Sequence, residues 1–111
     1  MKTEQPILIT SVKVDATLAD KKNVFVNFTG GLCDEDEKAL GVLNAETDSG
    51  EQAPIVCSGI ALILSGEDLS PGQPVRCGPN GKANALGAGT LNGYCMDNAL
   101  GADELVRILL I

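Results

Sequence analysis

"APIVCSGIALIL", residues 53–64, carries the clearest structural signal in the chain. Apolar residues fill both sets of alternating positions in this run, which is typical of a central strand that is covered on both faces. Gly59 interrupts the run near its middle, and a glycine inside a strand often marks a bulge or a bend. We therefore expect one long central strand that Gly59 divides in two.

Short strands are expected on both sides of this segment. The N-terminal run "PILITSVKV" alternates between apolar and polar residues, and the last run, "DELVRILLI", favours a strand over a helix because it is rich in β-branched residues and follows a turn that contains glycine. Asn80-Gly81 is a strong signal for a two-residue hairpin. The other expected strands lie within residues 23–28, 73–77, 82–86 and 92–99.

About seven short strands at these spacings predict an all-β fold, either a small β-barrel or a β-sandwich. A length of 111 residues fits a single domain with its own core. We expect residues 7–111 to form this domain and residues 1–6 to form a short N-terminal arm that ends at Pro6.

Two polar segments are predicted to be loops. In "SGEDLSPGQPVRC", residues 65–77, the Ser70-Pro71-Gly72 step fits a type II turn, and two adjacent carboxylates at Glu67 and Asp68 are too few for a calcium loop. The segment "DEDEKALGVLNAETDSG", residues 34–50, begins with the acidic cluster Asp34–Glu37, which either opens a helical turn that ends before Gly41 or belongs to a solvated loop; we favour the loop for the whole segment.

Composition excludes several classes of function. Fifteen acidic and eight basic residues give a net charge of −7, and the basic residues are scattered along the chain, so direct binding of nucleic acid is not expected. The N-terminus lacks the plan of a signal peptide, and no segment is long enough to span a membrane. The chain contains no histidine, and its carboxylates cluster locally, so no catalytic constellation emerges.

Three weaker signals remain. The four cysteines, spaced about twenty residues apart, fit small packing residues better than a metal or redox site, which stays an alternative. Lys21 in "LADKKNVF" could carry a lipoyl or biotinyl group, as in small β-structured carrier modules. The glycine cluster "GAGTLNG", residues 87–93, lacks the spacing of a phosphate-binding loop and predicts a surface hairpin.

Taken together, the stretches "KALGV", "GEQAPIVCSGIA" and "GADELVRILL" resemble a family of small tailed-phage proteins described as capsid decoration or cement proteins. The resemblance covers almost the whole chain. Some members of that family carry a label as a RecA-like or RadA-like recombinase, but this chain has neither the P-loop nor the basic DNA path that such an enzyme needs.

The resemblance implies a non-enzymatic structural protein of the virion, without a cofactor, that binds the outer surface of a phage head and stabilises the capsid. The expected partners are the major capsid protein and further copies of the chain, with a trimer favoured, and assembly is expected in the cytoplasm of the bacterial host. Neither nucleic acid nor membrane is an expected partner. The residues expected to contact the capsid or a neighbouring protomer are those of the arm: Lys2, Thr3, Glu4, Gln5 and Pro6.

Overall fold

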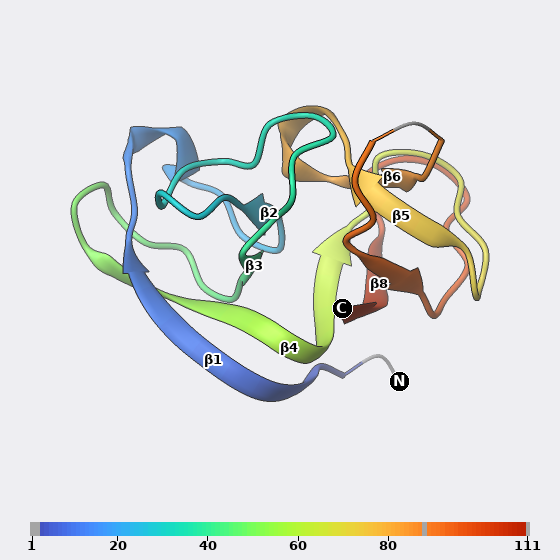
Figure 1. Ribbon diagram of the computed structural model, residues 1–111, viewed down its shortest axis with the longest axis horizontal. Coiled ribbons are helices and arrows are strands. Elements are labelled where there is room, and N and C mark those ends of the chain that lie inside the picture. Colours follow the sequence, from blue (N-terminus) through green and yellow to red (C-terminus); the bar gives the residue numbers. More distant parts are fainter. Residues whose placement is uncertain (1–2, 88, 111) are drawn as a thin grey trace.

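The computed structural model describes residues 3–87 and 89–110, which form an all-β domain with no α-helix in that part of the chain (Figure 1). Eight strands are joined by turns and loops, and two single 3₁₀ turns lie at Ala16–Leu18 and Pro79–Gly81. The strands are β1 (Gln5–Lys13), β2 (Phe25–Val26), β3 (Gly41–Leu43), β4 (Gln52–Leu64), β5 (Pro74–Cys77), β6 (Ala83–Ala85), β7 (Gly93–Cys95) and β8 (Leu105–Leu110). None of the helical turns in these ranges is long enough to cross a membrane.

Seven strands follow one path through the sheet, in the order β2-β3-β4-β8-β7-β5-β6, and β1 pairs with β4 beside this path. Every named pair is antiparallel. A single parallel bridge joins Ser65, just after β4, to Ala83 in β6, so the sheet nearly closes on itself. The predicted all-β fold is therefore confirmed, in its barrel-like form.

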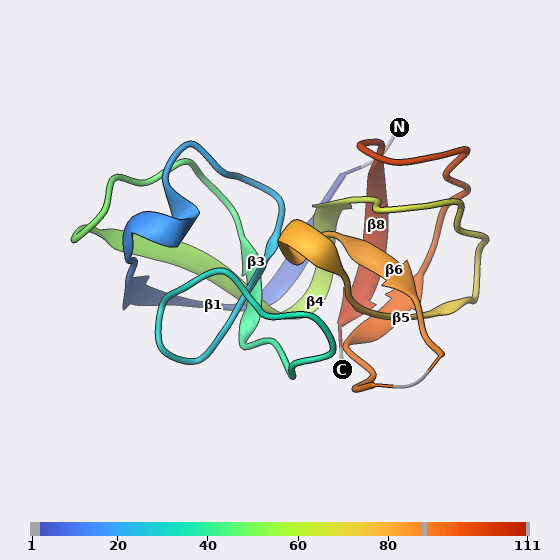
Figure 2. The same ribbon diagram turned by 90° about the horizontal axis from the view of Figure 1, so that it is seen from above.

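The chain is arranged in two lobes that β1 and β4 connect (Figures 1 and 2). Residues 14–51 form the N-terminal lobe, and residues 65–110 form the C-terminal lobe. Two clusters of buried apolar side chains fill the interior. The first core contains Val14, Leu18, Val24, Val26, Leu43, Ala53 and Ile55. The second core contains Val75, Val106 and Ile108 of the C-terminal lobe and Ile63 of β4, and it also reaches into the N-terminal lobe through Phe25 and Val42.

Strand β4 supplies side chains to both cores, and the face it presents to them changes at Gly59. Ile55 belongs to the first core and its neighbour Val56 to the second, as expected for residues on opposite faces of a strand. Unbroken alternation would place Ile63 on the face of Ile55, yet Ile63 belongs to the second core. The alternation is therefore inverted between these positions, so the predicted irregularity at Gly59 is confirmed, although β4 continues through it as one strand and is not divided in two.

The inversion coincides with irregular pairing between β1 and β4. Pro6 lies opposite Gly59, but the register shifts on either side of Leu8. Gly59 has a φ of 93°, a left-handed conformation that side chains disfavour. A Cβ atom there would lie 2.5 Å from the Gln5 carbonyl oxygen and 2.7 Å from the Ile7 nitrogen. Only glycine fits at this position without displacing β1.

We expect Gly59→Ala to lower the free energy of unfolding by roughly 2–4 kcal/mol, because it combines an unfavourable φ with a clash against the backbone of β1. Urea denaturation measures the change. Gly50→Ala is the matched control, since Gly50 has a φ of 88° but nothing within 4 Å of a Cβ atom, and we expect it to cost only about 1 kcal/mol. Equal losses in the two variants would show that contact with β1 does not constrain Gly59.

The local turn predictions are confirmed. The Gln73 nitrogen donates to the Ser70 carbonyl oxygen at 3.1 Å, and Gly72 has a φ of 84°, as a type II turn requires. Asn80 and Gly81 have φ values of 62° and 72° and lie in the turn between the paired strands β5 and β6, so the hairpin is confirmed; its connection is longer than two residues, because β5 ends at Cys77, β6 begins at Ala83 and Pro79–Gly81 form a 3₁₀ turn. The C-terminal run is strand β8, as expected.

Two predictions about connections need correction. Residues 87–93 were expected to form a hairpin, but the strands that they join, β6 and β7, lie on either side of β5 and do not pair with each other. Ala88 within that segment lies outside the described residues. The segment after the acidic cluster was expected to be a loop, and it does contain a short strand, β3, which pairs with β2 and β4. Both features depend on long-range pairing.

Candidate functional site

The outer surface of the C-terminal lobe carries a group of exposed apolar side chains. Residues directly opposite in an antiparallel pair share a face of the sheet, and the pairs Ile60↔Leu109 and Tyr94↔Leu109 therefore place three of these residues in one row across β4, β8 and β7. Leu105 and Leu109 are 41% and 46% exposed, whereas the intervening Val106 and Ile108 are buried. We call this surface the apolar face: it contains the exposed side chains of Tyr94, Leu105 and Leu109 and, beside them on β4, the half-buried side chains of Ile60 and Leu62.

The one basic side chain on β8 is neutralised within this surface. Arg107 lies opposite Leu62 and donates to both carboxylate oxygens of Asp97, at 3.1 and 2.9 Å. This hydrogen bonding raises the pKa of Arg107 above its ordinary value. The pair gives the surface a planar, bidentate contact with no net charge. A partner that covers the apolar face therefore meets apolar side chains around a neutral ion pair.

Strand β1 extends the exposed apolar surface along a sheet edge. Among the described residues β1 pairs with β4 alone, so its other edge has no strand beside it. Ile7, Leu8 and Ile9 are 83%, 55% and 46% exposed. An open edge that carries consecutive apolar residues is a template for pairing with another chain.

The structure places the expected arm residues at the start of this strand. Lys2 lies outside the described residues, and Thr3 is exposed. Glu4 is half-buried, and the Asn44 amide, with its nitrogen turned toward Glu4, donates to both carboxylate oxygens at 2.8 and 2.9 Å. Gln5 and Pro6 belong to β1, opposite Ile60 and Gly59.

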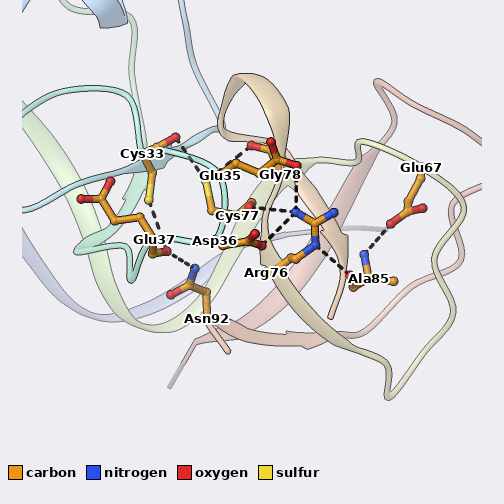
Figure 3. Close-up of polar contacts among 10 residues, drawn as sticks. All are labelled: Cys33, Glu35, Asp36, Glu37, Glu67, Arg76, Cys77, Gly78, Ala85 and Asn92. Atoms are coloured by element: carbon orange, nitrogen blue, oxygen red, sulfur yellow. Dashed lines mark hydrogen bonds and ion pairs between the residues drawn. The ribbon is translucent and has the colours of Figure 1, made fainter. Parts of the chain in front are cut away.

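The acidic cluster is anchored to the C-terminal lobe (Figure 3). The Asp36 nitrogen donates to the Cys77 carbonyl oxygen at 2.9 Å, and Arg76 Nη1 lies 3.1 Å from Asp36 and 3.4 Å from Glu35. The two carboxylate side chains are about half exposed, at 46% for Asp36 and 55% for Glu35. The predicted loop is confirmed, but it is attached to β5 on one side.

Asn92 fastens the same loop from the interior. It is 1% exposed, and its Oδ1 accepts from the Ala39 nitrogen at 3.0 Å while its Nδ2 donates to the Glu37 carbonyl oxygen at 3.0 Å. One side chain thus satisfies two backbone groups of a segment more than fifty positions away. The sequence holds no signal for this role, because asparagine before glycine is typical of a turn.

We expect Asn92→Ala to lower the free energy of unfolding by roughly 2–4 kcal/mol, because it leaves the Ala39 nitrogen without its side-chain partner in the interior and leaves the Glu37 carbonyl oxygen with only the weak contact of the Cys33 thiol. Thermal and urea unfolding measure the loss. The control is Asn98→Ala at an exposed position, for which we expect a change within about 0.5 kcal/mol. A neutral Asn92→Ala would mean that water replaces both hydrogen bonds at little cost.

In the described part of the chain, Glu67 and Lys21 do not have the surroundings of a ligand loop or of a carrier lysine. Glu67 accepts from the Ala85 nitrogen at 2.7 Å, so it supports the corner next to β6. Lys21 is half-buried in a groove of about 470 Å³ that Lys22 and Lys82 also line, and this position differs from the exposed hairpin tip of a carrier module.

The four cysteines, all in the described part of the chain, form no disulfide, and three of them are buried. Cys33, Cys77 and Cys95 belong to the second core, whereas Cys57 packs against the first. The thiols therefore do not converge on a single metal site. Among the described residues, no group of three or more histidine, cysteine or acidic side chains is arranged to hold a metal ion.

These features define a class of protein, a small barrel-like β domain with an apolar outer face and an open edge strand. No family model matches the chain, and no curated protein matches it. Among solved structures, the chain is similar to the N base of the head fiber protein gp8.5 of bacteriophage phi29, with a TM-score of 0.74 and 18% sequence identity. The match covers 94% of this chain and 95% of that one. At this identity the likeness shows a shared fold.

Proposed function

We propose that this protein is a structural component of a phage virion that binds the outer surface of the head and stabilises the capsid without catalysis. The observation that carries the proposal is the likeness in fold, over nearly the full length of both chains, to the base of a head fiber protein. The sequence resemblance to capsid decoration proteins supports it independently. An exposed apolar face around a neutral ion pair suits a protein that acts by adding contact area.

Two surfaces have separate roles in this proposal. The apolar face joins copies of the chain in a homo-oligomer, with a trimer favoured, and the arm residues Lys2–Pro6 contact the major capsid protein or a neighbouring protomer. The open edge of β1 continues from the arm, so an extended partner segment could add a strand there. The protein is assembled onto the head in the host cytoplasm and remains on the outer surface of the virion.

Co-sedimentation with phage heads tests the proposed function. We expect saturable binding of the purified protein to expanded, undecorated heads, at a fixed ratio to the shell subunit, and little binding to unexpanded proheads. Heads that carry the protein should also withstand heating better than bare heads. A protein that fails to sediment with expanded heads of its own phage at any concentration would overturn the proposal.

Removal of residues 1–4 tests the arm. We expect the truncated protein to lose head binding but to keep its fold, because Gln5 is the first residue of β1 and stays in place, while the loss of the Glu4–Asn44 contact costs only a small part of the stability. Circular dichroism and urea unfolding report the fold, and co-sedimentation reports binding. Full binding by the truncated protein would exclude a role for residues 1–4 in the contact.

Leu109→Glu tests the apolar face. A carboxylate in the centre of a buried contact has no partner, so we expect self-association to weaken by roughly tenfold or more. Sedimentation equilibrium measures the association constant. Leu100→Glu is the matched control, because Leu100 is 86% exposed and lies outside the sheet. Equal effects of the two substitutions would indicate that the added charge, and not the apolar face, controls association.

A further inference from the structure

Two buried cysteines lie side by side where the acidic loop, residues 33–37, is attached to β5 (Figure 3). Cys33 and Cys77 are 44 positions apart in the chain, yet the Cys77 thiol lies 3.3 Å from the Cys33 carbonyl oxygen. The Cys33 thiol lies 3.5 Å from the Glu37 carbonyl oxygen. Their residues are 2% and 0% exposed and pack in the same core.

The surrounding contacts hold the two cysteines in this arrangement. The Cys33 nitrogen donates to the Phe25 carbonyl oxygen at 3.1 Å, and the Cys77 carbonyl oxygen accepts from Asp36 at 2.9 Å. The backbone on both sides of the thiol pair is thus fixed by hydrogen bonds. Such fixation favours bond formation between the two sulfurs, since little chain entropy remains to be lost.

We propose that Cys33 and Cys77 are a built-in cross-linking site, at which oxidation by a low-molecular-weight disulfide forms a disulfide bond between the acidic loop and β5. The cross-link joins the N-terminal lobe to the C-terminal lobe at the point where they contact each other. It closes a loop of about 45 residues. The closed loop lowers the conformational entropy of the unfolded chain and so stabilises the folded protein.

The chemistry consists of two exchange steps. The thiolate of one cysteine attacks the small disulfide, whose sulfur–sulfur bond breaks and releases one small thiolate. The thiolate of the other cysteine then attacks the mixed disulfide, releases the second small thiolate and forms the Cys33–Cys77 bond. The two cysteine protons pass to the solvent and the released thiolates, and the small disulfide takes up the two electrons that the cysteines lose.

The environment of the pair makes the first step slow in the closed fold. The side-chain hydrogen bond with Cys77, followed by burial, raises the pKa of Cys33 far above its ordinary value. The group is therefore a neutral thiol at physiological pH, and attack on the oxidant waits for local opening of the acidic loop. Once the mixed disulfide forms, the adjacent thiol completes the reaction.

The timing of the reaction rests on the proposed virion role, whereas the cross-link itself does not. The bacterial cytoplasm keeps thiols reduced, and the medium outside the cell does not. A head protein would be assembled with reduced cysteines and cross-linked after release.

Oxidation of the purified full-length protein with oxidised glutathione tests the inference. We expect the intact mass to fall by two hydrogen atoms, and peptide mapping without reductant to join the Cys33 and Cys77 peptides. The melting temperature should rise by roughly 10 °C and return on addition of dithiothreitol. An unchanged mass after prolonged oxidation, a stable glutathione adduct alone, or a bond between another pair of cysteines would each overturn the inference.

Two variants give matched controls. The double variant Cys57→Ala, Cys95→Ala keeps only the proposed pair, and we expect the same loss of mass and the same shift. Cys33→Ala should show neither the loss of mass nor the shift in melting temperature. If that variant does not fold, peptide mapping of the oxidised wild-type protein shows whether Cys33 and Cys77 are joined. Co-sedimentation of the reduced protein with heads reports on the proposed function alone, so the two ideas can fail separately.

Discussion

The fold depends on one backbone constraint, the left-handed conformation of Gly59 in the middle of β4. Because the alternation of faces inverts there, the same strand buries Ile55 in the first core and Ile63 in the second. A regular strand of this length would place both on one face and leave one of the lobes without its central apolar contact. The absence of a side chain also lets β1 approach closely, so the long β1–β4 ribbon can follow both lobes.

The second constraint is the junction between the lobes. Both lobes contribute side chains to the second core there, and polar contacts fix the acidic loop on it. Phe25 and Val42 from the N-terminal lobe pack with Val75 and Val106 from the other, which supplies the apolar area. Asn92 and the ion pairs of Arg76 then fix the position of the loop on that core. The half-exposed ion pairs contribute little free energy by themselves, so their main effect is on orientation.

The sequence predicts those features of the structure that depend on neighbouring residues, and it does not predict those that depend on residues far apart in the chain. Gly59, the Pro71-Gly72 turn and the Asn80-Gly81 turn were predicted because each conformation depends on the residue itself and its neighbours. The path of residues 87–93 and the strand β3 were missed, since both depend on which distant strand provides the partner. Asn92, Arg76 and the contact between Cys33 and Cys77 were missed for the same reason. The C-terminal run was predicted to be a strand, but only the structure shows that its residues Leu105 and Leu109 lie on an exposed face.

The charge of the chain bears on how copies could associate. A net charge of −7 makes copies repel one another, but screening confines this repulsion to about 8 Å at physiological ionic strength. Attraction must then come from surfaces that are apolar and locally neutral, and the apolar face with its Arg107–Asp97 pair meets both conditions. Burial contributes roughly 25 cal/mol per Å² before the cost of association is subtracted, so a contact of modest area is weak by itself. When linked copies bind a symmetric shell at several equivalent sites at once, the overall affinity is much higher than that of each single contact. In the role proposed above, the apolar face therefore supplies a weak contact between copies in solution, and simultaneous binding of those copies to a symmetric shell would strengthen it.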